Sequence, residues 1–158
     1  MSFELAKQYL TQYGVENRIQ TFDVSSATVE LAAIAVGVEG ARIAKTLSFK
    51  SGDSAILIVA AGDARIDNKK FKSEFGMKAS MLSADDALRF TGHSVGGVCP
   101  FGVPEDIHVY IDESVKRFES VYPAVGSANS AIELTPDELF HISKATKWVD
   151  VCKLPETE

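Results

Sequence analysis

Apolar residues along this chain recur at helical spacing in the first segment, and several later segments show either alternation or short apolar runs that are typical of strands. Between residues 3 and 13 the apolar side chains recur at helical spacing. Ser2 can cap the start of this helix and Gly14 can end it. The pattern therefore predicts an amphipathic first helix that buries one face.

A strand and a second helix follow. Residues 18–23 alternate like a strand with one face in water. The second helix is predicted over 27–36, where Ser25 and Ser26 offer N-caps and Gly37 offers an end. These elements suit a sheet that is covered by helices.

A hairpin and two short helices are predicted next. The apolar runs 44–50 and 54–61 predict two strands, and residues 51–53 have the types that favour a tight antiparallel connection. Segments 67–75 and 83–90 each begin with a capping residue, and we expect both to be short helices. Four more strands are predicted over 107–111, 120–125, 131–134 and 148–151. A helix with Pro136 at its first position is predicted between the last two.

The elements together predict an α+β protein. Hairpin-length turns and short helices without regular strand-helix alternation favour one mixed, largely antiparallel sheet surrounded by short helices. We find no repeat or linker, so residues 1–154 are expected to form a single domain and residues 155–158 a tail.

Composition narrows the class of protein. The chain has 158 residues, of which 46% are hydrophobic and 24% charged, as in an ordinary water-soluble domain that folds as one unit. A net charge of −6 and an isoelectric point near 5.1 disfavour tight binding to long duplexes, so we expect no DNA partner, whereas a short nucleic-acid end stays open. No apolar run reaches the roughly 20 residues that span a bilayer, and no basic leader opens the sequence, so a cytoplasmic protein without a membrane partner is expected.

Cysteine usage gives no sign of a metal or cofactor. Cys99 and Cys152 are far apart and form no Cys-x-x-Cys pair, which argues against a zinc knuckle, a dithiol redox motif and a disulfide scaffold. We therefore expect neither a metal nor a cofactor.

Lys45 is the first candidate for chemistry. It begins an apolar strand, where its charge would be desolvated and would act strongly on an anion or a reacting group. The ordinary alternative is an edge-strand lysine that faces water, and sequence position does not choose between the two.

A glycine-rich segment over 91–104 is the second candidate. Its glycines and prolines interrupt any helical period, so it must be a shaped loop whose backbone N–H groups can cradle a carbonyl or phosphate. A long connector is the alternative, but long loops inside compact domains tend to bind something. His93 in this loop could be a general base or could simply bond its own loop, and Cys99 is interpreted as lining rather than attacking.

A second glycine turn follows at Gly126–Ser130. Ser127 and Asn129 have short polar side chains that suit the binding of hydroxyls or an amine, although the same types make ordinary turns. A lysine cluster over 69–78 could touch a tRNA backbone, but a solvated helix face is the favoured interpretation.

Taken in order, four segments resemble one family: Thr28–Ala33, Lys45–Leu47, Gly92–Gly102 and Gly126–Asn129. They are similar to the YbaK-type aminoacyl-tRNA deacylases, which include the insertion editing domain of bacterial prolyl-tRNA synthetases and its free-standing relatives. The resemblance covers nearly the whole chain. It implies a mixed fold with a strongly curved sheet, and hydrolysis of the ester between a wrong amino acid and the terminal adenosine of a tRNA.

The resemblance also implies roles for residues. The family's lysine matches Lys45, and its Gly-x-x-x-Pro loop matches the run Gly96, Gly97, Val98, Cys99 and Pro100. The lysine would bind a phosphate or other polar groups of the substrate, and the loop backbone would hold the scissile carbonyl, with His93 beside it.

The second turn and the substrate complete the expectation. Gly126, Ser127 and Asn129 would frame the amino acid, and Asn129 leaves the choice between cysteine and alanine open because some relatives carry a bulkier residue there. The expected partners are the acceptor end of an aminoacyl-tRNA, such as Cys- or Ala-tRNA(Pro), and prolyl-tRNA synthetase. The alternatives are a non-catalytic module that binds an aminoacyl-nucleotide or tRNA end, and an interaction domain that docks through its glycine loop.

Overall fold

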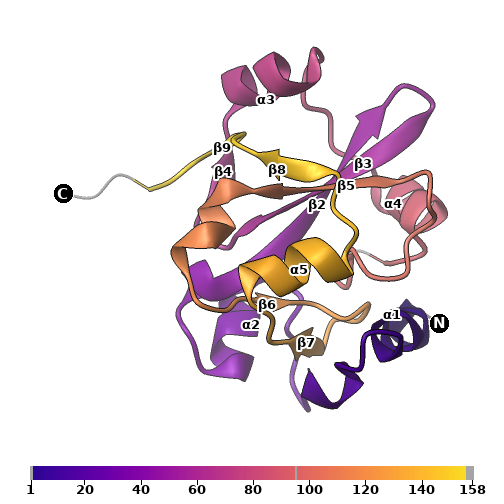
Figure 1. The fold of residues 1–158 in the computed structure, drawn as a ribbon, viewed down its shortest axis with the longest axis vertical. Helices are drawn as coiled ribbons and strands as arrows, with labels where there is room; N and C mark the ends of the chain where they lie inside the picture. The colour runs from indigo at the N-terminus through magenta and orange to yellow at the C-terminus, as the bar shows by residue number, and fades with distance from the viewer. Residues whose placement is uncertain (1, 95, 156–158) are drawn as a thin grey trace.

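A five-stranded sheet in the order β6-β2-β3-β5-β8 runs through the computed structural model, which describes residues 2–94 and 96–155 (Figure 1). Residue 95 of the glycine loop and residues 156–158 of the expected tail lie outside the described residues. The strands have these bounds: β2 Ile43–Ser51, β3 Ser54–Ala61, β5 His108–Asp112, β6 Tyr122–Pro123 and β8 Lys147–Val149.

The predicted hairpin is confirmed. Strands β2 and β3 pair in antiparallel fashion from Ala44 opposite Ala61 to Ser51 opposite Ser54. Strands β6, β5 and β8 instead join the sheet in parallel, since longer segments connect them. Two small antiparallel ladders also form, of β1 (Ile19–Thr21) with β7 (Ser130–Ile132) and of β4 (Arg65–Ile66) with β9 (Cys152–Lys153). A mixed α+β architecture is therefore confirmed. The expectation of a largely antiparallel sheet is wrong for the five-stranded sheet, because three of its four strand pairings are parallel.

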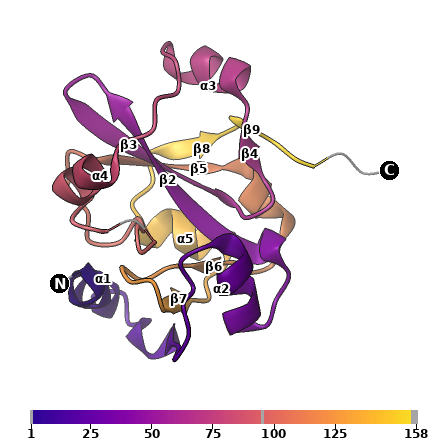
Figure 2. The ribbon, with the colours of Figure 1, turned by 180° about the vertical axis from the view of Figure 1, so that it is seen from behind.

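Short helices surround this sheet, and none of those described is long and apolar enough to cross a membrane. Figures 1 and 2 place α2 beside β6 and β7 at one end of the molecule and α3 at the other. The α-helices are α1 Ser2–Thr11, α2 Val29–Val36, α3 Asn68–Phe75, α4 Ala84–Thr91 and α5 Pro136–Ile142. The 3-10 helices are η1 Glu16–Arg18, η2 Gly40–Arg42 and η3 Glu113–Arg117.

Helix starts follow local capping chemistry, with one correction. Helices α3 and α4 begin after the predicted caps Asp67 and Ser83. The prediction that Ser25 or Ser26 caps α2 is wrong, because Thr28 does so by accepting a hydrogen bond from the Leu31 N–H at 3.2 Å. Ser26 is held outside the helix because its N–H donates to the Ala128 carbonyl at 2.6 Å.

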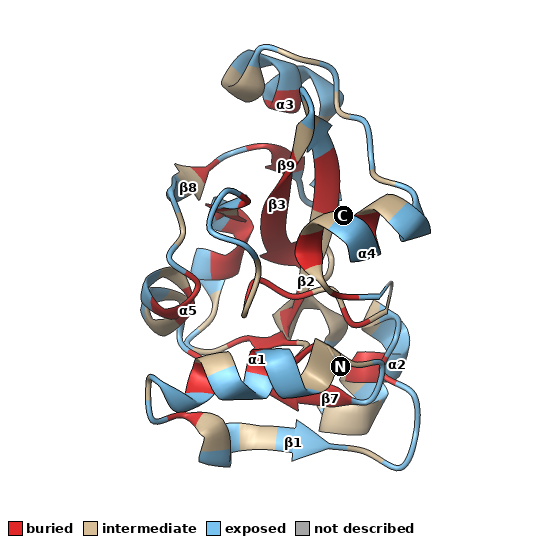
Figure 3. Ribbon diagram, turned by 90° about the vertical axis from the view of Figure 1, so that its right-hand side faces the viewer, coloured by how far each residue is buried: buried red, intermediate tan, exposed pale blue. Residues whose placement is uncertain are grey.

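Strand β3 is buried on both faces. Leu57 and Val59 pack into the larger apolar cluster of the protein, whereas Ile56 and Ile58 pack into a second cluster with Phe71 of α3. Figure 3 shows the strand as buried along most of its length. Because successive side chains point to opposite faces, a nearly continuous apolar run is what a central strand requires.

The adjacent strand β2 is only partly covered along its outer edge. Strand β6 pairs with Ile43 and Ala44, and the next backbone contact along that edge is the bond from the Leu82 N–H to the Ser48 carbonyl at 3.0 Å. Among the described residues, the part of β2 between these two contacts has no partner strand on this side. This open part of β2 forms one wall of the cleft described in the next subsection.

Candidate active site

A cleft of about 260 Å³ lies along the open part of β2. Its walls come from residues 26–28, from Val29 and Ala32 of α2, from β2 itself, from the loop at Gly96 and Val98, and from Ser130 and Ala131 of β7. The lining is mostly apolar, and the described residues that line it include no aspartate or glutamate. Elsewhere in the described chain, no group of three or more His, Cys, Asp or Glu side chains is placed to bind a metal ion.

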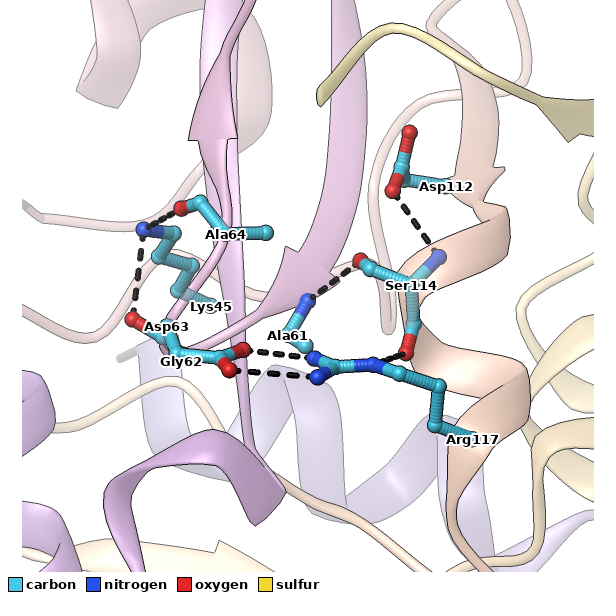
Figure 4. A network of polar contacts seen from close by, with 8 residues as sticks. All are labelled: Lys45, Ala61, Gly62, Asp63, Ala64, Asp112, Ser114 and Arg117. Atoms are coloured by element: carbon cyan, nitrogen blue, oxygen red, sulfur yellow. Dashed lines mark hydrogen bonds and ion pairs between the residues drawn. The ribbon is translucent and has the colours of Figure 1, made fainter. Parts of the chain in front are cut away.

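Lys45 stands between this cleft and a larger polar hollow. It lines both the cleft and the hollow of about 820 Å³, whose walls also include Arg65 and Lys153. Its ammonium group donates to the carbonyls of Gly62, at 3.4 Å, and of Ala64 (Figure 4). Burial lowers the pKa of Lys45 because desolvation disfavours its charged form, and nearby Asp63 opposes that shift.

The turn that supplies these carbonyls is itself held by an ion pair. Asp63 accepts two hydrogen bonds from the guanidinium of Arg117, at 2.5 and 3.1 Å, and Arg117 also donates to the Ser114 carbonyl at 2.9 Å (Figure 4). These bonds hold the pKa of Asp63 below its ordinary value. The Ser114 hydroxyl in turn accepts the Ala61 N–H at 3.1 Å. Each of these groups is therefore fixed before any ligand arrives.

The two glycine turns meet backbone to backbone. A Cβ on Gly97 would lie 2.6 Å from the backbone nitrogen of Ser127, so no larger residue fits there without displacing the chain. Gly96 has a φ of +93°, and a Cβ there would come within 3.3 Å of the Ala27 Cβ. Lys45 and the first loop therefore share one cleft, while the second turn backs that loop.

Ser127 and Asn129 do not line the cleft. The Asn129 side-chain amide donates to the Phe22 carbonyl at 3.1 Å, and the Phe22 N–H donates back to the Asn129 carbonyl at 2.9 Å. The Ser127 hydroxyl donates to the Asn129 side-chain oxygen at 3.0 Å. These bonds fasten the second turn to the segment before α2, and Ser130 next to them reaches the cleft.

His93 and Cys99 lie in the interior rather than in the cleft. Both are 0% exposed, and the His93 ring bonds the Ser2 hydroxyl at 2.5 Å and the Phe101 carbonyl at 2.8 Å. Burial lowers the pKa of His93 and raises the pKa of Cys99 to about 12. The bond to Phe101 agrees with the interpretation that His93 bonds its own loop. Cys99, which was interpreted as lining the site, instead faces the interior because the loop folds inward there.

Pro100 and Gly126 also remain outside the lining. Both are buried where the loop and the second turn pack against the rest of the protein. A Cβ on Gly126 would come within 2.4 Å of the Ser2 carbonyl oxygen, so this glycine allows the start of α1 to approach the turn. Of the predicted site residues, the structure brings Lys45, Gly96 and Val98 to the cleft.

Among the lining residues that were not predicted as site residues, two have unpaired hydroxyl groups. The Ser26 Oγ and the Thr46 Oγ1 are buried without a hydrogen-bond partner, and both residues line the cleft. Leaving a buried hydroxyl unpaired costs about 1–3 kcal/mol, and such groups are rare in native proteins. Thr46 follows Lys45 directly and its place on the strand is a usable signal, whereas Ser26 resembles an ordinary helix cap in the sequence.

One family model covers the residues of the cleft and of both glycine turns. A model of the aminoacyl-tRNA editing domain matches residues 23–142, which include every cleft wall. The chain belongs to this family. The editing domain is thus the scaffold on which Lys45 and the glycine loop are placed.

Relatives of this editing domain agree with the assignment. The chain is 56% identical over 154 residues to the uncharacterized protein YwhH of Bacillus subtilis, covering 97% of this chain and 98% of that protein. It is 27% identical over 118 residues to EbsC of Enterococcus faecalis, a candidate Cys-tRNA(Pro)/Cys-tRNA(Cys) deacylase, with 73% and 72% covered. A crystal structure of a candidate trans-editing enzyme for prolyl-tRNA synthetase superposes with a TM-score of 0.86 at 27% identity, covering 96% and 97%.

Proposed function

We propose that this editing domain hydrolyses the ester that joins a wrongly attached small amino acid to the terminal adenosine of a tRNA. The observation that carries the proposal is the place of Lys45, which lines both the small cleft and the polar hollow. An aminoacyl ester joins a small group to a nucleotide. With the amino acid in the cleft and the nucleotide in the hollow, the ester lies beside Lys45.

The sizes and charges of the two spaces support this arrangement. The cleft of about 260 Å³ is smaller than the roughly 300–1,000 Å³ of sites for drug-sized ligands, so it suits a group of few atoms. The hollow of about 820 Å³ is lined by the cations Lys45, Arg65 and Lys153 and by the carboxylates of Glu30 and Asp63. Because Asp63 is already paired with Arg117, cationic groups remain for the phosphates of a nucleic-acid end. Such a local contact is compatible with the acidic net charge of the chain.

The proposed chemistry needs no protein nucleophile. Water adds to the ester carbonyl, the bond to the ribose oxygen breaks, and the amino acid leaves with a free carboxylate while the tRNA regains its hydroxyl. The ammonium of Lys45 stabilises the negative charge that develops on the carbonyl oxygen, and the loop wall at Gly96 and Val98 holds the aminoacyl group against it. The deeper loop residues, Gly97 and Pro100 among them, keep that wall in place.

The names of two relatives support the choice of substrate. The names of EbsC and of the superposed structure point to Cys-tRNA(Pro) and to prolyl-tRNA synthetase, and alanine belongs to the same size class. A synthetase pocket separates amino acids that differ by one methylene by only about 1–3 kcal/mol, so a second pocket for small side chains is useful. We propose that the chain acts in trans on the acceptor end of Cys- or Ala-tRNA(Pro).

Replacement of Lys45 tests this function. Purified full-length protein is incubated with Ala- and Cys-tRNA(Pro), and deacylation is followed for the wild type, Lys45→Met and Lys50→Met. Lys50 is a matched control because it lies on the same strand, is exposed, and lines neither the cleft nor the hollow. We expect kcat/KM to fall about 100-fold for Lys45→Met, as for the loss of one charge-stabilising donor, and to stay unchanged for Lys50→Met.

Two results would contradict the proposal. Equal activity of Lys45→Met and the wild type, with equal melting temperatures, would remove Lys45 from the reaction. An absence of turnover with every charged tRNA, together with a melting temperature raised by aminoacyl-adenosine analogues, would favour the non-catalytic binding module instead.

A further inference from the structure

The ladder of β4 and β9 places two cations directly opposite each other (Figure 1). Arg65 is the register partner of Lys153, and Ile66 is that of Cys152. Side chains of directly opposite residues project from the same face of a ladder, with their Cβ atoms roughly 4.5–5.5 Å apart. Ile66 and Cys152 pack into the second apolar cluster. Arg65 and Lys153 therefore project from the other face, where both are exposed and line the polar hollow.

This pair of cations is unfavourable in the free protein. Like charges directly opposite each other destabilise an antiparallel ladder, and a ladder of two residue pairs has few backbone bonds to offset the repulsion. Among the described residues, neither cation forms an ion pair. The hollow itself offers the carboxylates of Glu30 and Asp63, of which Asp63 is paired with Arg117. A bound anion would remove the repulsion.

The pair lies beside the lysine to which the reaction is assigned. The Lys45 ammonium donates to the carbonyl of Ala64, and Arg65 is the next residue in the chain. Burial lowers the pKa of Lys45, and the charge of Arg65 adds to this shift, which shows that the two cations are within electrostatic reach of each other. A ligand that holds its ester at Lys45 would therefore place the groups next to the ester near the ladder.

We infer that Arg65 and Lys153 clamp a backbone phosphate near the 3′ end of the tRNA between β4 and β9, a step that rests on the function proposed above. A guanidinium presents a planar fork that can bond two oxygens of one phosphate, and an ammonium adds a point charge beside it. The phosphate replaces the repulsion across the ladder by two attractions. Lys153 lies beyond residues 23–142, which the family model matches, so β9 adds a binding group to the editing domain.

The test measures binding without hydrolysis, so it does not depend on turnover. The probes are an uncharged RNA hairpin that carries the single-stranded 3′ end of tRNA(Pro), the same hairpin without that end, and inorganic phosphate. The full chain is compared with Arg65→Met, Lys153→Met and the double variant. Lys50→Met is the matched control, because Lys50 is also an exposed lysine on a strand but lies opposite Ala55 and lines neither the cleft nor the hollow.

We expect each single variant to bind the hairpin with the 3′ end about 3- to 10-fold more weakly than the wild type, and the double variant more weakly still. The slope of log K against log salt concentration should become shallower by up to about 1 in each single variant, as for the loss of a phosphate contact. Lys50→Met should keep the wild-type affinity. In deacylation assays KM should rise while kcat stays within about twofold, because the clamp holds the nucleotide and does not touch the reacting atoms.

The free protein gives a second measurement. Either single variant removes the repulsion across the ladder, so its melting temperature should lie about 1–3 °C above that of the wild type, whereas Lys50→Met should show no such rise. A merely structural role for the two cations would instead lower the melting temperature when one of them is replaced, and that result would overturn the inference.

The other outcomes are also decisive. Equal affinities and equal salt slopes of the wild type and the double variant would overturn the clamp and leave the proposed function intact. Equal weakening for the hairpins with and without the 3′ end would overturn it too, and so would an effect confined to inorganic phosphate. Binding that depends on the clamp, together with an absence of deacylation of every charged tRNA, would support the clamp and reject the proposed hydrolysis.

Discussion

The polar groups behind Lys45 and those in the wall of the cleft differ in how completely they are paired. Behind Lys45, the carbonyls of Gly62 and Ala64 accept from its ammonium, and Arg117 holds Asp63 with two hydrogen bonds. In the cleft, the hydroxyls of Ser26 and Thr46 have no partner. The polar groups of the first region are fully paired in the folded protein, and these two hydroxyls of the second are not. Changes in the first region should therefore alter stability, whereas changes that displace the cleft wall should alter activity as well.

A change at the contact between the two glycine turns should give the largest loss of both stability and activity. In Gly97→Ala the new Cβ would lie 2.6 Å from the Ser127 backbone nitrogen, so the loop must move away and the cleft wall moves with it. We expect a loss of about 2–3 kcal/mol in the free energy of unfolding, as for overpacking, and a fall of at least 10-fold in kcat/KM. Denaturant unfolding and deacylation assays measure the two effects.

Gly76→Ala is the control for this change. Gly76 ends α3 with a φ of +68°, and a Cβ there would meet nothing within 4 Å. The left-handed backbone alone should cost about 1–2 kcal/mol, with activity unchanged. If Gly97→Ala kept full activity, the packing of the two turns would have no part in shaping the cleft.

Replacement of Cys99 should lower stability by a smaller amount and leave activity nearly unchanged. Its side chain is fully buried with His93 and Phe101, and the pKa near 12 keeps the thiol protonated at neutral pH. We expect Cys99→Ala to lower the free energy of unfolding by about 1 kcal/mol and to leave kcat/KM within about twofold. A loss of activity above 10-fold with an unchanged melting temperature would instead give the thiol a direct part in the reaction.

The Asp63–Arg117 pair should give the smallest effect, and it depends on pH. Because Arg117 holds the pKa of Asp63 below its ordinary 3.8, the pair stabilises the fold above about pH 4 and loses that contribution as the pH falls through the lowered pKa. The two side chains are 27% and 33% exposed, so solvent screening limits the effect to less than about 1 kcal/mol.

Melting temperatures of the wild type and Asp63→Asn at pH 7 and pH 3 measure this contribution. The gap between the two proteins should be present at pH 7 and smaller at pH 3. Asp53→Asn, in the exposed β2–β3 turn, is the control and should show no gap at either pH. A gap that widens toward pH 3 would mean that the pair destabilises the folded protein.

Local signals in the chain were sufficient for much of the fold. The hairpin of β2 and β3, the caps Asp67 and Ser83, and the start of α5 at Pro136 depend on residues that are close together in sequence. The parallel pairing of β6 and β8 could not be predicted in this way, because it depends on contacts between distant segments. The two-residue ladder of β4 and β9 was missed for the same reason, since so short a run carries no periodicity.

By itself, the sequence determined that an apolar β2 carries Lys45 and that two glycine turns interrupt the regular structure, since residue type alone sets periodicity and backbone freedom. Only the tertiary structure decided which residues face the cleft. His93 and Cys99 are buried in the interior, and Asn129 bonds the Phe22 carbonyl instead of lining the cleft. Ser26 is buried in the cleft wall beside the open edge of β2. Burial and the pairing of polar groups arise from segments that are far apart in the chain, so no local pattern specifies them.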